Sequence, residues 1–207
     1  MIVTPTCRLP RSFAVALAGA ALILLLQAMP AILPALEYRR DVLTGQPWRL
    51  ITAHLVHVNW THALANAAAW VVLARLFGPR LDATRQALSL ALGALCVSLA
   101  LAAFYPSISW YRGASGALHA LFFAGATGEW IAAIRGRSMR ASLLSSLLLA
   151  GGWIKVAVEL PHDSATPFAD WLAATTVPQA HLLGAIAGTV LGLGFAALRR
   201  AGTKLTR

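Results

Sequence analysis

Ser115 is the residue of this sequence best placed to act as a nucleophile. It stands between Gly113 and Gly116 at the start of an apolar stretch long enough to cross a membrane. A serine attacks a peptide carbonyl when a base takes its proton, when donors stabilise the oxyanion, and when the substrate backbone has room. Glycines provide that room, and they also let helices pack closely. The serine is therefore either a hydrolase nucleophile or part of a helix-packing motif.

His181 is the candidate base. It begins another apolar stretch, in which Gly184 and the glycines at 188 and 192 are spaced four apart. A second stripe of small residues, at 116, 120, 124 and 128, follows Ser115. Residues three or four apart share one face of a helix, so two such faces could pack closely and bring His181 to Ser115. The matching histidine favours the hydrolase interpretation.

His62 and Asn66 are candidates for stabilising an oxyanion, since both can donate hydrogen bonds and lie four residues apart. The alternative is hydrogen bonding between helices. His54 and His57 precede them, so the histidines could instead bind zinc, and histidines on several helices could ligate haem. The segment has no carboxylate, no cysteine and no His-Glu-x-x-His motif, which makes metal the weaker interpretation. We expect no metal and no cofactor.

Three further polar residues belong to these stretches. His119 lies one helical turn after Ser115 and could line a substrate pocket or donate to a neighbouring carbonyl. Lys155 and Glu159 are four apart, a spacing that predicts an ion pair near the outer end of their helix.

The composition indicates a membrane protein. The 207 residues are 58% hydrophobic and only 12% charged, whereas a soluble domain has about a quarter charged residues. The charges cluster between long apolar runs, as in polytopic membrane proteins. The net charge of +10 does not indicate nucleic-acid binding, because no basic segment is interleaved with aromatic residues. The expected partners are the lipid bilayer and transmembrane protein substrates; nothing indicates an oligomeric state.

Six stretches are long enough to span a bilayer as helices of about 20 residues. They cover 13–36, 60–77, 87–105, 113–134, 141–160 and 177–198 of a single domain, 1–207. The first is longer than the apolar core of a signal peptide, so we expect an uncleaved anchor that Pro30 and Pro34 kink or end. The expected fold class is an all-α membrane protein, a bundle of six transmembrane helices.

The basic residues predict the orientation, because 12 of the 17 fall on one side of these spans. These twelve are Arg8, Arg11, Arg75, Arg80, Arg85, Arg135, Arg137, Arg140, Arg199, Arg200, Lys204 and Arg207. The positive-inside rule makes that side, and both termini, cytoplasmic. The second, fourth and sixth spans then enter from the outer face, which brings His62, Ser115 and His181 to one membrane depth.

These patterns resemble the rhomboid family of intramembrane serine proteases. The resemblance rests on residues 113–116, on residues 180–184, and on His57 followed by the segment 62–66. Their order and spacing match the family's six-helix core over almost the entire chain. The resemblance implies a multi-pass protein of the bacterial inner membrane.

The resemblance also implies roles for individual residues. Ser115 would be the nucleophile and His181 the general base, in a dyad without an aspartate. His62, Asn66 and the backbone N–H of Ser115 would form the oxyanion hole, with His57 as an accessory residue.

The compact length and the runs 111–119 and 155–159 are similar to the rhombosortase branch, which is thought to process C-terminal Gly-Gly sorting tails. Two features depart from well-studied rhomboids. The first outer loop, 37–47, is short, with Trp48-Arg49 a poor substitute for a Trp-Arg pair within it, and His119 stands where many members carry an aromatic residue.

The expected function is therefore an intramembrane serine endopeptidase that cuts transmembrane substrates near the outer face, at Gly-Gly-type tails. Two alternatives remain: a generic rhomboid protease of other single-span substrates, and a non-catalytic rhomboid-like binding protein. The presence of both Ser115 and His181 argues against the second.

Overall fold

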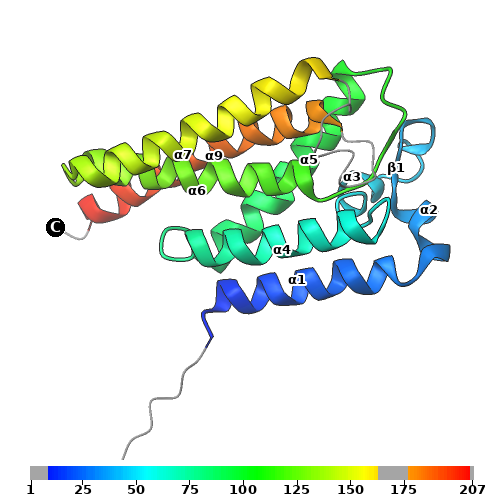
Figure 1. The fold of residues 1–207 in the computed structure, drawn as a ribbon, viewed down its shortest axis with the longest axis horizontal. Helices are drawn as coiled ribbons and strands as arrows, with labels where there is room; N and C mark the ends of the chain where they lie inside the picture. Colours follow the sequence, from blue (N-terminus) through cyan, green and yellow to red (C-terminus); the bar gives the residue numbers. More distant parts are fainter. Residues whose placement is uncertain (1–8, 163–176, 206–207) are drawn as a thin grey trace, which may run out of the picture.

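The computed structural model describes residues 9–162 and 177–205 of the chain. Six long helices lie side by side in this part of the chain (Figure 1). They are α1 (Arg11–Gln27), α4 (Trp60–Phe77), α5 (Ala83–Phe104), α6 (Ser115–Arg135), α7 (Met139–Glu159) and α9 (Pro178–Leu205). Each begins inside or close to one of the six expected spans, and α9 continues beyond the expected end at 198. Most of the expected outer loop at 161–177 lies outside the described residues, as do Arg8 and Arg207.

Four helices, α5, α6, α7 and α9, are each long and apolar enough to cross a membrane. A fifth span results if α1 and the short helices after it count as one bent segment. Helix α4 is not among the four, because polar residues such as His62, Asn66 and Arg75 reduce its hydropathy. Of these, His62 and Asn66 are the residues predicted from the sequence to belong to a site.

The stretch 13–36 is a bent pair of segments rather than one straight helix. Helix α1 ends at Gln27, and a 3-10 turn, η1 (Pro30–Ile32), and α2 (Leu33–Leu36) follow at an angle of 89° to α1. Proline lacks the N–H that an inner helical turn requires, but it fits the first turn of a new helix. Pro30 and Pro34 both occupy such starting positions, which explains the bend.

Helix α6 lies at the centre of the bundle and packs most closely against α9. A β-carbon at Gly184 would overlap the carbonyl of Gly116, and one at Gly188 would overlap the carbonyl of Ala120. The two backbones therefore touch along the stripes of small residues. The stripe on α6 ends earlier than its spacing suggests, because Gly128 faces the side chain of Arg80.

A two-stranded antiparallel sheet lies at one end of the bundle. Strand β1 (Tyr38–Arg39) pairs with β2 (Trp110–Tyr111), so that Tyr38 stands opposite Tyr111. Glu37 reinforces this pairing, since its carboxylate accepts hydrogen bonds from Trp110 Nε1 at 2.6 Å and Arg112 Nε at 2.7 Å. These contacts hold the segment that leads into Ser115.

The short first loop continues through η2 (Arg40–Val42) to α3 (Arg49–Thr52). Trp48 Nε1 donates to the carbonyl of Ala35 at 3.2 Å, and buried Arg49 donates to the carbonyls of Pro34 and Glu37 at 2.8 and 2.7 Å. Trp48 and Arg49 therefore close the loop onto α2, a function that their position at the loop's end did not suggest.

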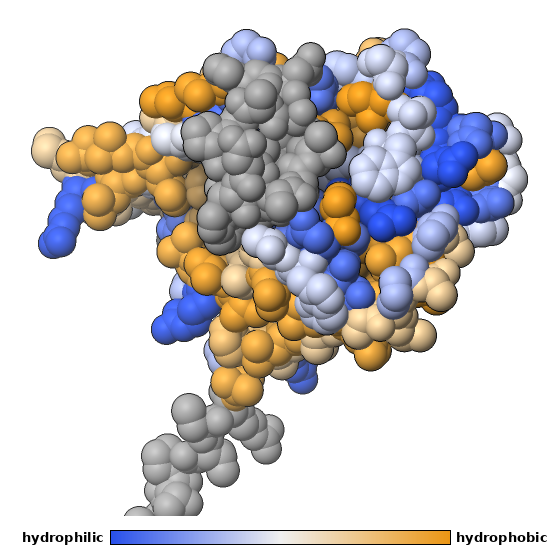
Figure 2. All heavy atoms as spheres, turned by 45° about the vertical axis from the view of Figure 1, so that its right-hand side comes forward, coloured by the Kyte–Doolittle hydropathy of each residue, from blue (hydrophilic) through white to orange (hydrophobic). Residues whose placement is uncertain are grey.

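The N-terminal ends of α4, α6 and α9 meet at the end of the bundle that carries this sheet (Figure 1). Hydrophilic residues gather in one part of that end, whereas hydrophobic residues cover much of the other surface visible in Figure 2. Three helix starts therefore converge at one polar end of an apolar bundle.

Candidate active site

Ser115 is the first residue of α6, and the chain reaches it through a constrained turn. Gly113 has a φ of +131°, which L side chains rarely adopt, and a β-carbon there would also meet the ring of His62. The Gly113 N–H donates to Ala53 O at 3.0 Å, and Tyr111 Oη donates to Gly113 O at 2.6 Å. The glycine thus sets the position of Ser115 by its conformation and its close approach to His62.

His181, from the first turns of α9, lies beside Ser115. The distance from His181 Nε2 to Ser115 Oγ is 2.9 Å, and the histidine is 5% exposed. This is within the range in which a general base can accept a proton from a hydroxyl. The structure brings these two residues together from positions 66 apart in the chain.

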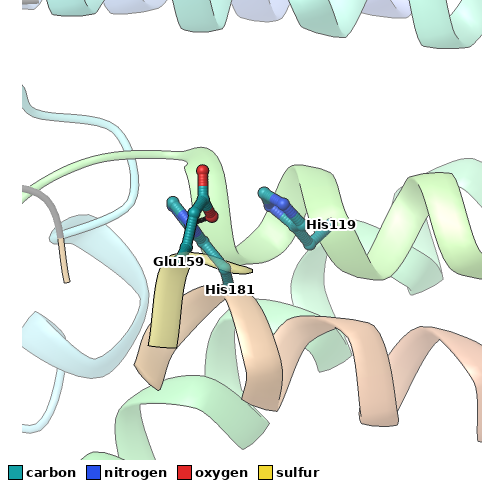
Figure 3. A group of neighbouring side chains, drawn as sticks. All are labelled: His119, Glu159 and His181. Atoms are coloured by element: carbon teal, nitrogen blue, oxygen red, sulfur yellow. Dashed lines mark hydrogen bonds and ion pairs between the residues drawn. The ribbon is translucent and has the colours of Figure 1, made fainter. Parts of the chain in front are cut away.

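Glu159, the last residue of α7, contacts the other ring nitrogen of His181 (Figure 3). Its Oε2 is 2.8 Å from His181 Nδ1 and 2.9 Å from Lys155 Nζ. The expected ion pair with Lys155 is therefore present, but sequence reasoning missed the contact with His181. A carboxylate in an apolar helix, expected near the outer end of that helix, was the available signal, because such groups are seldom without a function.

His119 completes the group on α6. Its Nδ1 donates to the Ser115 carbonyl at 2.7 Å, because a carbonyl oxygen only accepts. Its Nε2 is 3.0 Å from Lys155 Nζ and accepts from that ammonium. The ring lies nearly parallel to that of His181, with centroids 4.3 Å apart. His119 thus bonds a neighbouring carbonyl and also lines a cavity, the two roles considered from the sequence.

His62 and Asn66 lie across the cavity on α4, both buried. His62 Nδ1 and Asn66 Nδ2 have no hydrogen-bond partner among the described residues. A buried polar group without a partner costs about 1–3 kcal/mol. The side chain of Asn59 caps α4 by accepting from the N–H of His62 at 2.8 Å, which fixes the start of this helix.

His57 and His54 lie behind the cavity rather than in its wall. His57 Nε2 accepts from the Ala114 N–H at 3.3 Å, and its ring meets that of His62 edge-on at 4.9 Å. Burial lowers the pKa of His57 to about 3, so the ring is neutral near pH 7. His54 Nε2 contacts Ser98 Oγ at 3.0 Å, and burial lowers its pKa to about 4. The Nε2 atoms of the two rings face different partners, whereas their Nδ1 atoms have none among the described residues.

His119, Glu159 and His181 are close enough to hold a metal ion, with one donor atom from each within 4.8 Å of the others. However, the Lys155 ammonium lies 3.0 Å from His119 Nε2 and 2.9 Å from Glu159 Oε2. The Lys155 ammonium therefore already occupies two of the three atoms that would bind a metal ion, His119 Nε2 and Glu159 Oε2.

A cavity of about 300 Å³ connects these groups. Its polar lining consists of His62, Asn66, Ser115, His119, Lys155 and His181. The remaining wall is Ala65, Ala69, Leu73, Leu118, Phe122, Phe123 and Gly152. Gly116 and Gly184 belong instead to the contact between α6 and α9, so they shape the cleft only through helix packing. The cavity can hold a short apolar segment next to a hydroxyl that is paired with an imidazole.

Comparison with known families gives a match over most of the chain. A family model described as rhomboid domain matches residues 44–198, well over half of the chain. The match starts before α3, extends into α9 and includes each of the site residues described above. A search of curated proteins finds no match.

Proposed function

Since the chain belongs to the rhomboid family of intramembrane serine proteases, we propose that Ser115 and His181 form its catalytic pair and cleave a peptide bond of a transmembrane substrate. The observation that carries this proposal is the 2.9 Å contact between His181 Nε2 and Ser115 Oγ at the wall of a largely apolar cavity. A serine alone is a weak nucleophile at neutral pH, and an adjacent imidazole that takes its proton activates it.

The reaction follows from the positions of the donors. Ser115 Oγ bonds to the scissile carbonyl carbon as His181 Nε2 takes the hydroxyl proton. The oxyanion then accepts hydrogen bonds from Asn66, His62 and the Ser115 N–H, and this assignment is supported by two buried nitrogens on α4, His62 Nδ1 and Asn66 Nδ2, that have no partner among the described residues. His181 returns the proton to the leaving amine, and water releases the acyl group.

The proposed topology has six spans, with the bent α1–α2 segment and α4 added to the four clearly apolar helices. The basic residues at the ends of α4, α6 and α9 support a cytoplasmic location for that face and for both termini. The cavity then lies near the outer face of the membrane, which we take to be a bacterial inner membrane.

The proposed substrate is a C-terminal tail of the rhombosortase type, in which glycine-rich residues precede one apolar helix. A glycine-rich segment forms a weak helix and unwinds easily. The mixture of polar groups and an apolar wall in the cavity suits such a segment. The compact loop between α2 and α3 leaves little surface on which a folded substrate domain could bind.

Labelling with a fluorophosphonate tests the catalytic proposal directly. In this reaction the Ser115 oxygen bonds to phosphorus, the P–F bond breaks, fluoride leaves, and His181 takes the proton. We expect the purified protein to be labelled at Ser115, and Ser115→Ala and His181→Ala to fold but remain unlabelled. Labelling should persist in a chelator. A folded wild-type protein that stays unlabelled would favour a binding protein, and loss of labelling on chelation would favour the zinc alternative.

A further inference from the structure

We propose that Glu159 is a positioning residue for His181, so that this protein uses a Ser-His-Glu arrangement instead of a simple dyad. The inference rests on the proposed function of Ser115 and His181. It arises from the 2.8 Å contact between Glu159 Oε2 and His181 Nδ1, on the side of the ring opposite Ser115.

The contacts around Glu159 form a closed circle of hydrogen bonds that begins and ends at Ser115. Ser115 Oγ contacts His181 at 2.9 Å, His181 contacts Glu159 at 2.8 Å, and Glu159 contacts Lys155 at 2.9 Å. Lys155 then contacts His119 at 3.0 Å, and His119 donates to the Ser115 carbonyl at 2.7 Å. Because residues of α6, α7 and α9 all take part, this closed set of contacts restrains the position of the His181 side chain from three helices.

The carboxylate determines which nitrogen of His181 carries the proton. An ionised carboxylate only accepts hydrogen bonds, so Nδ1 of His181 must be the donor. In the neutral ring this leaves Nε2 unprotonated and directed at the Ser115 hydroxyl. When the ring gains a second proton during attack, the neighbouring negative charge stabilises the imidazolium, as in other serine triads.

Lys155 has a separate part in this arrangement. The charged and titratable groups that face His181 are Glu159 and Lys155 on α7, His119 on α6 and His62 on α4. The ammonium holds the carboxylate and opposes the charge that His181 gains, whereas Glu159 favours that charge. Removing Glu159 and removing Lys155 should therefore shift the pH at which the rate falls on the acid side of the pH–rate profile in opposite directions.

The first experiment compares rates of fluorophosphonate labelling from pH 5 to 9. In Glu159→Gln the shape is preserved, but the amide can donate to Nδ1 and so favour the wrong tautomer. We expect labelling to slow by about 100-fold or more, since a lost triad acid costs up to about 10⁴-fold. The acid limb, which is the fall of the labelling rate at low pH, should move to lower pH in Glu159→Gln, because the carboxylate favours protonation of His181. It should move to higher pH in Lys155→Met, because the ammonium opposes that protonation.

A matched control exists in Glu129, which pairs with Arg80 at 3.0 Å near the other end of α6. Glu129→Gln also removes one ion-paired carboxylate, and it should label at the wild-type rate. Labelling of Glu159→Gln at the wild-type rate, or acid limbs that move in the same direction in both α7 variants, would overturn the proposal. An unlabelled wild-type protein would instead contradict the proposed function itself.

A measurement on the wild-type protein avoids any loss of folding in the variants. In ¹⁵N-histidine-labelled protein at neutral pH, the His181 signals are identified by their loss in His181→Ala. We expect the tautomer protonated at Nδ1. The tautomer protonated at Nε2 would show that Glu159 does not position the ring, and the proposal would fail.

Discussion

At the residue scale, the cavity combines a serine paired with a histidine and buried polar nitrogens that have no partner among the described residues. Ser115 and His181 contact each other, whereas His62 Nδ1 and Asn66 Nδ2 are buried without hydrogen-bond partners among the described residues. A folded protein tolerates such groups when they gain a partner during function. Both residues line the same cavity as Ser115, which is why we propose that they stabilise an oxyanion.

Asn66→Ala should therefore lower turnover while leaving the protein folded. The loss of one oxyanion donor costs about 10–1000-fold in kcat, with a smaller change in KM, because the bond strengthens in the transition state. Steady-state cleavage of a transmembrane reporter measures both constants. Thr127→Val is the matched control, since Thr127 Oγ1 is another buried group without a partner but lies outside the cavity lining. Equal losses in the two variants would assign Asn66 a structural role only.

At the element scale, the contact between α6 and α9 determines whether His181 reaches Ser115. His181 is one turn before Gly184, and Ser115 directly precedes Gly116. The backbones at Gly116 and Gly184 are close enough that a β-carbon on Gly184 has no room. The same close contact that packs α9 against α6 therefore also places His181 beside Ser115.

Gly184→Ala should push α9 away from α6, lower the melting temperature and slow fluorophosphonate labelling by at least about tenfold, since a displacement near 1 Å can cost about 100-fold. Gly194→Ala is the control on the same helix, because a β-carbon at Gly194 meets nothing within 4 Å. It should label normally and be neutral or slightly more stable, because alanine is the better helix former. Normal labelling of Gly184→Ala would show that the close backbone contact is not required.

At the scale of the whole molecule, the bundle has one end with the site and another end with many of its basic residues. The N-termini of α4, α6 and α9 carry His62, Ser115 and His181, whereas the opposite ends carry Arg75, Arg135 and Arg199 (Figure 1). Such a polarity is typical of a membrane protein with its basic end in the cytoplasm.

The topology can be tested with single cysteines at Ala201 and Ser164, after Cys7 and Cys96 are replaced by serine. With an odd number of spans between the two positions, an impermeant thiol reagent added to intact cells should label Ser164→Cys, and it should label Ala201→Cys only after the membrane is opened. Labelling of both cysteines from the same side of the membrane would contradict an outer loop at 161–177 together with a cytoplasmic C-terminus.

The substrate proposal can be tested by co-expressing a secreted reporter that carries a glycine-rich tail, one apolar helix and a basic end. We expect release at the glycine-rich segment, dependent on Ser115, with the new C-terminus located by mass spectrometry. Valines in place of the glycines should slow release, since a glycine-rich segment unwinds more easily. If this tail stays intact while a generic single-span substrate is cut, the protein is a rhomboid protease of the ordinary type.

The sequence by itself determined the helical class and the family, and it predicted the starts of five of the six long helices to within two residues and that of α5 to within four. Apolar runs of membrane length are local properties. The motifs at the helix starts also selected Ser115, His181, His62 and Asn66, which line one cavity; their catalytic roles stay predictions. The bend after Gln27 was also visible in its prolines, although its angle of 89° was not.

Only the tertiary structure decided how α7 contributes to the group of residues around His181. The spacing of Lys155 and Glu159 predicts their ion pair, because four residues make one helical turn. It does not predict the contact between Glu159 and His181, which depends on how the end of α7 packs against the start of α9. Contacts between helices depend on the rotation and depth of each helix. The stripes of small residues predicted the close packing of α6 and α9, but no comparable local pattern indicates where the end of α7 lies.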